Sequence, residues 1–351
     1  MKIILHAGMH KTGSSSIQRT LNAADLPNHA IPQTAAGNLS GVVSMLFDDE
    51  PEKGVMAVSN GLTKEELKRR GDIWKNRLVE TLRCDKEYGV LSAEKISTLP
   101  QSGLIRLREF IEKFSPDIKV VAYVRKPVSF MQSAFQQRVK GGAGQSLFAG
   151  TIWPNYQKRF AGIDDIFGRE NVTLKIFDPD HLRSRDVVID FFSEIGVDLS
   201  PEVVIRTNES LSLEATALLY VQRRLGDGAV QNFLGAPAAN NAFIEALQGI
   251  GTGKLMFSSE FIGPILEKNR ADLEWMEARL GMPLEDAPET EGRLIGSEED
   301  LLTVAEENYA ALTDRLVETI RADGRSSRDR LVRNLNALRA LCYASLDSSR
   351  N

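Results

Sequence analysis

The sequence predicts an α/β fold, in which helices cover both faces of a parallel β-sheet and a mostly helical C-terminal portion follows. Short apolar runs alternate with helical patterns over residues 1–210, as in sheets built from strand–helix–strand units. The strongest run, 118–124 (IKVVAYV), is apolar at nearly every position, which is typical of a strand covered on both faces. From Ser210 onward the hydrophobic spacing is helical. We therefore expect an α/β core at 1–210 and a helical extension at 211–351 that packs on it.

Local signals place each element in the first part of the core. Thr63 and Glu66 have the spacing of a capping box, which predicts the start of a helix, and Pro116 ends the following one. The expected elements are, in chain order, a strand at 2–7, a helix at 14–21, a helix at 63–83, a strand at 88–92 and a helix at 104–114.

Similar signals continue along the chain. Pro127 favours the first turn of a helix after the strand at 118–124, and Gly196 marks a helix end. Ser297 and Asp300 lie at the start of a long amphipathic pattern. The elements expected here are a helix at 128–139, a strand at 172–177, a helix at 187–195, a long helix from Ser297 to Ile320 and a last helix after Gly324.

The composition excludes several classes of protein. The chain has 351 residues, 42% of them hydrophobic, so it can bury a sizeable core. Its formal charge of −5 argues against a nucleic-acid binder, so any anion must be held by a local site. Cys84 and Cys342 cannot make a disulfide framework, and no apolar run is long enough for a membrane span or a signal peptide. We expect a cytoplasmic protein without a transmembrane segment.

A Gly/Ser-rich loop at residues 8–16 (GMHKTGSSS) lies between the first strand and the first helix. Gly8 and Gly13 permit a tight turn, and the backbone N–H groups and dipole of the helix favour an anion there. Lys11 adds a full positive charge. Because Lys11 precedes Gly13, the order differs from that of a nucleotide triphosphate loop. The hydroxyl donors of the loop are Thr12, Ser14, Ser15 and Ser16.

Arg125 directly follows the strongest strand, and Ser133 comes eight residues later, in the next expected helix. Because the carboxyl ends of parallel strands meet at one edge of a sheet, Arg125 and Lys11 are expected to face one ligand. Arginine binds phosphate through two parallel hydrogen bonds. The two segments together predict a site for a phosphorylated ligand.

The segments KTGSSS and RKPVSFMQS resemble the signature of sulfotransferases that use 3′-phosphoadenosine 5′-phosphosulfate (PAPS). The stretches LSAEKIS, RTNESLS and ADLEWMEARLG are similar to bacterial members of that family. The resemblance implies the P-loop-like sulfotransferase fold, with PAPS as co-substrate and 3′-phosphoadenosine 5′-phosphate (PAP) as product. Many relatives have proline where this chain has His10.

In that family the lysine loop holds the 5′-phosphosulfate, and the Arg…Ser pair holds the 3′-phosphate. A late basic loop also reaches the 3′-phosphate or the adenine in related enzymes, although here it could equally be an exposed loop. The donor-binding residues that the resemblance implies are Lys11, Thr12, Gly13, Ser14, Ser15, Ser16, Arg125, Ser133 and Arg206.

The resemblance implies transfer of a sulfuryl group to a hydroxyl or amine, without a metal. We expect the acceptor to be a carbohydrate or a lipid-linked molecule. Lys11 would neutralise the bridging oxygen, and a Glu or His base would take the acceptor's proton. Glu94, just after the strand at 88–92, is the first candidate base, although it could instead cap a turn or pair with Lys95. His10 is the second candidate, and it could instead be a packed loop residue, while His6 is expected to be buried.

Three features leave alternatives open. Residues 140–156 contain four glycines with Phe148, Trp153 and Tyr156, which could form an acceptor lid or simply anchor a loop. The leucine spacing in the last two helices could support a homodimer or pack on the core. The whole chain could also be a P-loop-like kinase, which the position of Lys11 disfavours, or a nucleotide-binding scaffold without catalysis.

Overall fold

The computed structural model describes residues 1–35, 37–142, 152–207, 210–226, 236–286, 292–322, 324 and 326–347. At its centre is a five-stranded, wholly parallel sheet of order β2-β3-β1-β4-β5. The strands are β1 (Lys2–His6), β2 (His29–Ala30), β3 (Tyr88–Ser92), β4 (Ile118–Val124) and β5 (Val172–Ile176). The predicted α/β class and four of these strands are confirmed. The fifth, β2, was not predicted, because its two residues are too few to show the hydrophobic pattern of a strand.

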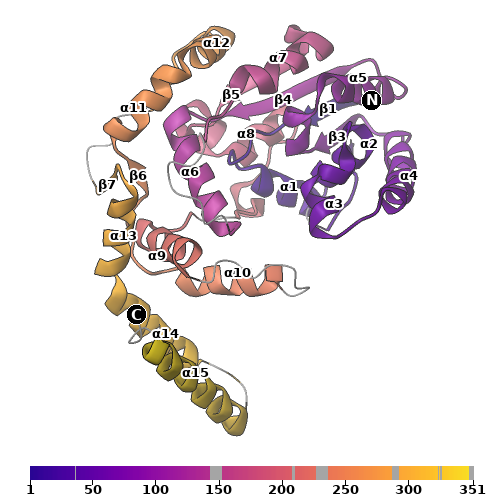
Figure 1. Ribbon diagram of the computed structural model, residues 1–351. Helices are drawn as coiled ribbons and strands as arrows, with labels where there is room; N and C mark the ends of the chain where they lie inside the picture. The colour runs from indigo at the N-terminus through magenta and orange to yellow at the C-terminus, as the bar shows by residue number, and fades with distance from the viewer. Residues whose placement is uncertain are drawn as a thin grey trace. The chain divides into compact units, whose positions relative to one another are not determined.

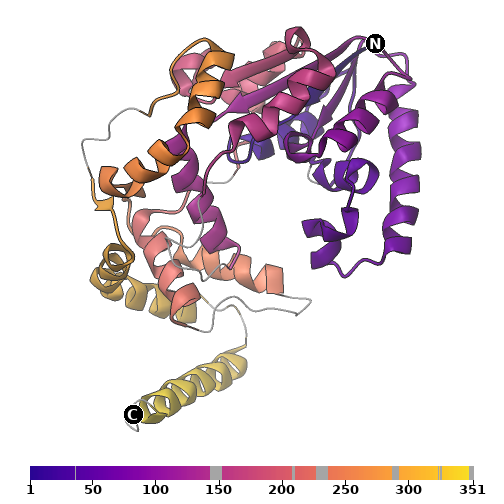
Figure 2. The same ribbon diagram turned by 45° about the horizontal axis from the view of Figure 1, so that its top comes forward.

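Helices cover both faces of this sheet, as predicted (Figures 1 and 2). On one face, α1 and α8 pack over Ile4, Val121 and Tyr123 in the hydrophobic core. On the other face, α5 and α7 pack together, and α7 contacts β4 and β5. The helices of this part are α1 (Ser14–Ala23), α2 (Ser40–Phe47), α3 (Val55–Ser59), α4 (Lys64–Leu82), α5 (Gln101–Ile111), α6 (Pro127–Lys140), α7 (Tyr156–Phe167) and α8 (Val187–Glu194).

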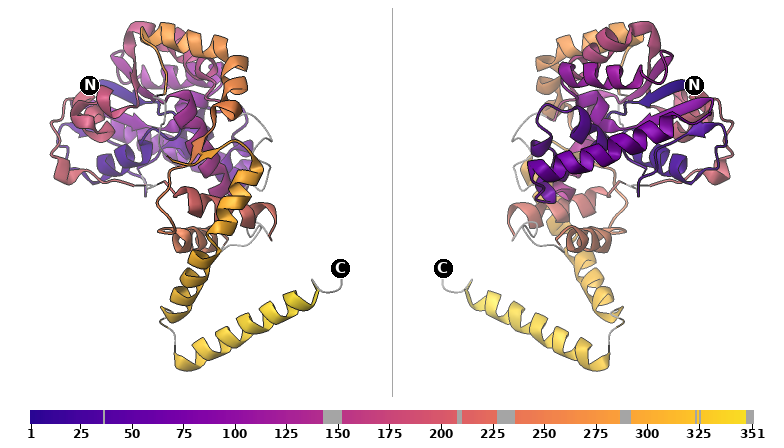
Figure 3. Two further views of the ribbon diagram at one scale, coloured as in Figure 1. Left: turned by 90° about the vertical axis from the view of Figure 1, so that its left-hand side faces the viewer. Right: turned by 90° about the vertical axis from the view of Figure 1, so that its right-hand side faces the viewer.

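The helix starts follow the capping signals in the sequence. Thr63 accepts a hydrogen bond from the backbone N–H of Glu66 at the start of α4, the long purple helix in the right-hand view of Figure 3. Ser297 and Asp300 form a reciprocal capping box at the start of α13. The capping signals therefore predict helix starts correctly in both parts of the chain.

The chain folds into two units that are each discontinuous in sequence. The first unit consists of Met1–Phe135, Thr151–Ser210 and Ser259–Pro288, and the second of Gln136–Gly150, Leu211–Ser258 and Glu289–Asn351. One crossing lies at Ser210, where we placed the boundary. The others fall elsewhere, because residues 259–288 return to the first unit and 136–150 leave it. That the extension packs on the core stays a prediction.

The segment that returns to the first unit consists of α11 (Ser259–Lys268), α12 (Arg270–Leu280) and the residues after them. It docks through polar contacts. Asp272 accepts hydrogen bonds from the backbone N–H groups of Tyr156 (2.9 Å) and Gln157 (2.8 Å) at the start of α7. Arg279 donates two hydrogen bonds to Asp164 (2.6 and 2.9 Å). These contacts make the segment part of the α/β unit.

The second unit is mainly helical, and α9 packs against α13. Two findings differ from the sequence prediction. A two-stranded parallel sheet joins β6 (Met256–Phe257) to β7 (Leu294–Ile295), and the long helix expected from Ser297 to Ile320 is broken at Asn308. Its helices are α9 (Leu213–Arg224), α10 (Ala236–Leu247), α13 (Glu298–Glu307), α14 (Tyr309–Arg321) and α15 (Ser327–Asp347). Across the described ranges, no helix combines the length and apolarity needed to span a membrane.

Candidate anion-binding and catalytic site

The loop between β1 and α1 is a tight turn with two residues in the left-handed region. Lys11 has φ of 68° and Gly13 has φ of 76°. A β-carbon on Gly13 would lie 2.5 Å from Cγ1 of Val187, so only glycine fits there. The Thr12 hydroxyl donates to the carbonyl of Met9 (2.6 Å) and holds the turn closed. Because a left-handed lysine costs on the order of 1 kcal/mol or more, this turn has to be fixed by its surroundings.

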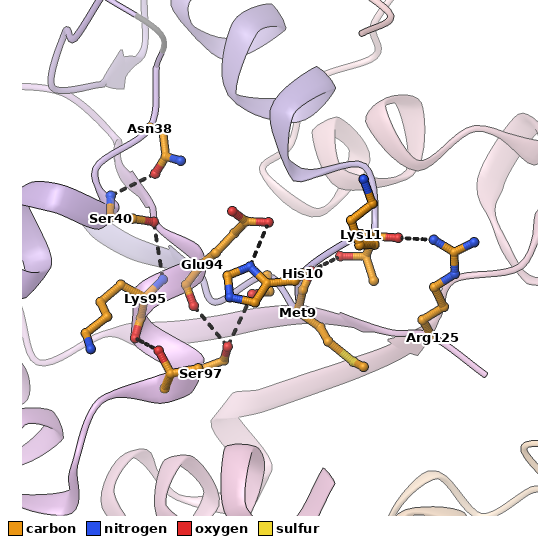
Figure 4. A network of polar contacts seen from close by, with 12 residues as sticks. Met9, His10, Lys11, Asn38, Ser40, Glu94, Lys95, Ser97 and Arg125 are labelled. Carbon is orange, nitrogen blue, oxygen red and sulfur yellow. Dashed lines mark hydrogen bonds and ion pairs between the residues drawn. The ribbon is translucent and has the colours of Figure 1, made fainter. Parts of the chain in front are cut away.

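The structure places Arg125 beside this loop. Its Nη1 donates to the carbonyl oxygen of Lys11 at 2.6 Å, across 114 residues of sequence (Figure 4). Its Nε donates to Oγ of Ser129 at 3.3 Å, and Tyr156 OH donates to the Arg125 carbonyl at 2.6 Å. Arg125 and Lys11 therefore lie together at the carboxyl ends of β4 and β1, as their positions in the sequence predicted.

The Arg125 guanidinium is half-buried. Burial lowers its pKa to about 10, while the carboxylate of Asp286 acts in the opposite direction. No carboxylate oxygen of the described residues comes within ion-pair distance of it. Ser133 is buried two turns further along α6. A cation held in this way can bind an anionic ligand without first breaking an ion pair.

A carboxylate already occupies the start of α6. Asp286 accepts hydrogen bonds from the backbone N–H groups of Val128 (2.7 Å) and Ser129 (3.0 Å). Burial raises the pKa of Asp286, and these two bonds counteract the rise. Nothing in the sequence around Asp286 indicates this contact, because it joins segments about 160 residues apart.

Glu94 begins a short 3₁₀ turn directly after β3 and points to the loop. Its Oε1 lies 3.5 Å from Nδ1 of His10 (Figure 4). Lys95 contacts Asp48 instead, so the alternative that Glu94 pairs with Lys95 is wrong. The Glu94 side chain is 21% exposed and that of His10 is 53% exposed, so His10 is not a packed loop residue. The two candidate bases therefore form one pair.

The ionisation of Glu94 suits a base. Burial raises its pKa, but the combined effects of His10, His6 and the Ser14 hydroxyl outweigh burial and place the pKa below its usual value. Glu94 is therefore ionised at neutral pH and can accept a proton.

His6 and Ser14 both lie next to Gly8 of the loop. His6 is fully buried, as expected, and its Nδ1 lies 2.7 Å from Oγ of Ser92. Burial lowers the pKa of His6 to about 4, against the opposing effect of Glu94. Among the described atoms, Nε2 of His6 has no hydrogen-bond partner, and the Ser14 hydroxyl lies close enough to Glu94 to help lower the pKa of that carboxyl. A β-carbon on Gly8 would lie 2.4 Å from Ser14 Oγ and 3.2 Å from His6 Nε2.

The other donor-binding candidates are divided. Ser16 Oγ accepts a hydrogen bond from the backbone N–H of Thr207 (3.1 Å), which draws the loop after residue 203 to the start of α1. Arg206 precedes the residue that makes this contact, but its guanidinium pairs with Asp186 at 2.8 Å and its side chain is 66% exposed. Ser15 is partly exposed at the start of α1, and Asn208 lies outside the described residues.

Of the two alternatives for the aromatic residues at 153–156, acceptor lid or loop anchor, the structure favours the anchor. Trp153 is 5% exposed and donates from Nε1 to Asp272 (2.6 Å). Tyr156 is fully buried and holds the Arg125 carbonyl. Phe148 and most of the glycine-rich loop, residues 143–151, lie outside the described residues. Stacking of Trp153 or Tyr156 on an acceptor is therefore excluded.

Sequence reasoning missed Arg159, in the first turn of α7. It donates from Nε to the carbonyl of Pro154 (2.7 Å) and from Nη1 to Ser97 Oγ (3.4 Å). A lone arginine in an amphipathic helix carries no signal of its own. Within the described part of the chain, no group of three or more His, Cys, Asp or Glu residues is arranged to hold a metal ion.

Comparison with known proteins adds little. No family model matches the chain. It is similar to an uncharacterized protein of Archaeoglobus fulgidus, with 25% identity over 142 residues, or 39% of this chain and 38% of that protein. The chain thus matches well under half the length of this curated relative. Any function has to be argued from the site itself.

Proposed function

We propose that the chain is a PAPS-dependent sulfotransferase. The observation that carries this proposal is the convergence of Glu94, Lys11 and Arg125 at one edge of the sheet. They follow β3, β1 and β4, which are neighbours in the strand order. A base, a lysine loop and a separate arginine are what transfer from a doubly phosphorylated nucleotide needs.

The residues present fit this donor. Gly13 and the N–H groups at the start of α1 offer a turn that a phosphate can approach closely, and the Ser14 hydroxyl lies in the first turn of that helix. Lys11 and this loop would hold the 5′-phosphosulfate. Arg125 and Ser133 would hold the 3′-phosphate. Arg206 would join them only by leaving Asp186.

The chemistry assigns one role to each side chain. Glu94 accepts the proton of the acceptor hydroxyl or amine as the new bond to sulfur forms. Lys11 and the loop N–H groups stabilise the electron pair that stays on the 5′-phosphate oxygen when its bond to sulfur breaks. The products are the sulfated acceptor and PAP. The expected acceptor is a carbohydrate or a lipid-linked molecule.

The test measures binding before activity. We expect PAP and PAPS to raise the thermal stability of the full chain, by about 2.7 kcal/mol at a hundredfold excess over the dissociation constant. Arg125→Ala should lose this shift, while Arg169→Gln, at an exposed position in the same unit, should keep it. An increase in thermal stability with Mg-ATP alone would favour the kinase interpretation instead. The absence of a shift with any of the three would indicate a scaffold.

A further inference from the structure

Arg159 is a half-buried cation that makes no ion pair with the residues that the structure describes. Its two hydrogen bonds go to neutral groups, the Pro154 carbonyl and the Ser97 hydroxyl. Burial lowers its pKa, and Glu94 opposes the effect from a distance. No carboxylate of the described residues forms an ion pair with it. A guanidinium has five N–H donors, so most of the planar edge of Arg159 is not used by the protein residues described.

Structural cations of the same unit behave differently. Arg279 is paired with Asp164 through two hydrogen bonds, Lys126 with Asp178 at 2.6 Å, and Lys175 with both Asp190 and Glu194. Burying a charge is costly unless an opposite charge or a ligand compensates it. In the described part of the first unit, the arginines whose pKa is lowered by burial are Arg125 and Arg159. Arg125 has an anionic ligand in the proposed function, and Arg159 has none yet.

The position of Arg159 indicates what it binds. Ser97, which accepts its hydrogen bond, donates to the carbonyls of Glu94 (2.9 Å) and Gly8 (3.3 Å). One hydroxyl therefore connects the guanidinium to the turn that carries the base and to the loop between β1 and α1; Figure 4 shows the contacts of Ser97 to that turn and that loop. The charge of Glu94 also acts on the pKa of Arg159, so Arg159 lies on the Glu94 side of a group that would be held between this base and Lys11.

We propose that Arg159 binds the oxygens of the sulfuryl group while that group is still on the donor. The inference rests on the proposed function and adds a residue to it. Lys11 and Arg125 recognise the phosphates, which PAP and PAPS share. Arg159 recognises the sulfuryl oxygens, which PAPS alone has. The planar guanidinium suits a tetrahedral oxyanion, and its positive charge offsets the repulsion between that group and ionised Glu94.

The experiment compares the dissociation constants of PAP and PAPS by calorimetry, for the wild-type chain, Arg159→Gln, Arg159→Lys and Arg169→Gln. We expect Arg159→Gln to weaken PAPS binding by about tenfold or more and PAP binding by less than about twofold, because one charge-assisted hydrogen bond is lost. Arg159→Lys should restore part of the difference. Arg169→Gln, at an exposed arginine after α7, should leave both constants unchanged.

The outcomes separate the two proposals. Wild-type chain that binds neither nucleotide overturns the proposed function, whatever Arg159 does. If the wild-type chain binds both nucleotides and Arg159→Gln leaves the ratio of their dissociation constants unchanged, only the role of Arg159 is overturned. A purely structural role would weaken both nucleotides equally and lower the melting temperature. That result also overturns the inference.

Discussion

Gly13→Ala tests whether the phosphate loop is held against α8 in the way described. Alanine in the left-handed region at φ of 76° costs about 1–2 kcal/mol. Its β-carbon would also lie 2.5 Å from Cγ1 of Val187, more than 1 Å inside normal carbon–carbon contact. Relieving such a contact costs about 1–3 kcal/mol. We expect a total loss of about 2–5 kcal/mol in the free energy of unfolding.

A second substitution separates the two causes. Val187→Ala removes Cγ1, so Gly13→Ala in that background should cost the backbone strain alone. The double-mutant cycle should then show a coupling of about 1–3 kcal/mol between the two positions. Urea unfolding can be followed by tryptophan fluorescence, because Trp74, Trp153 and Trp275 all lie in the first unit. Additive losses would refute the close approach of Gly13 to Val187.

Three further predictions concern the base, the lysine and the buried histidine. Glu94→Gln should lower turnover at least about a hundredfold in single-turnover assays. The dissociation constant of PAP, measured by calorimetry, should not change. Weaker PAP binding would make Glu94 a binding residue. Lys11→Ala should reduce both PAPS affinity and turnover, and normal turnover would remove Lys11 from the mechanism. Since the pKa of His6 falls from 6.5 to about 4 on folding, the unfolded chain binds more protons between these values. The contribution of neutral His6 to the free energy of unfolding should therefore be complete above pH 6.5. It should fall by about 3 kcal/mol as the pH is lowered to 4. Denaturation curves of His6→Gln at several pH values should lack this part of the pH dependence. If the free energy of unfolding changes with pH as in the wild-type chain, groups other than His6 are responsible.

The sequence predicted those features that depend on neighbouring residues. β4 could be recognised from seven apolar-rich positions, and the turn between β1 and α1 from its glycines and hydroxyls. The position of Glu94 followed from the rule that parallel strands end at one edge. These are local patterns combined with one rule of topology.

The remaining features depend on contacts between distant segments. Arg159 and Asp286 reach the site from α7 and from beyond α12, and no local pattern distinguishes them from surface residues. The break at Asn308 interrupts a continuous amphipathic pattern, and the burial of Trp153 depends on Asp272, 119 residues away. Such contacts form only after the chain has folded, so they are not visible in a window of sequence.

The two carboxylates that start α6 and α7 affect how the protein is made. Asp272 and Asp286 are synthesised more than a hundred residues after the helices that they cap. At about 5–20 residues per second, a ribosome needs on the order of ten seconds to cover that distance. During this interval the nascent α6 and α7 lack their caps, and Arg125 lacks the nearby charge of Asp286. This edge of the sheet therefore takes its final form late in synthesis, after residues 272–286 have emerged and bound the starts of α6 and α7.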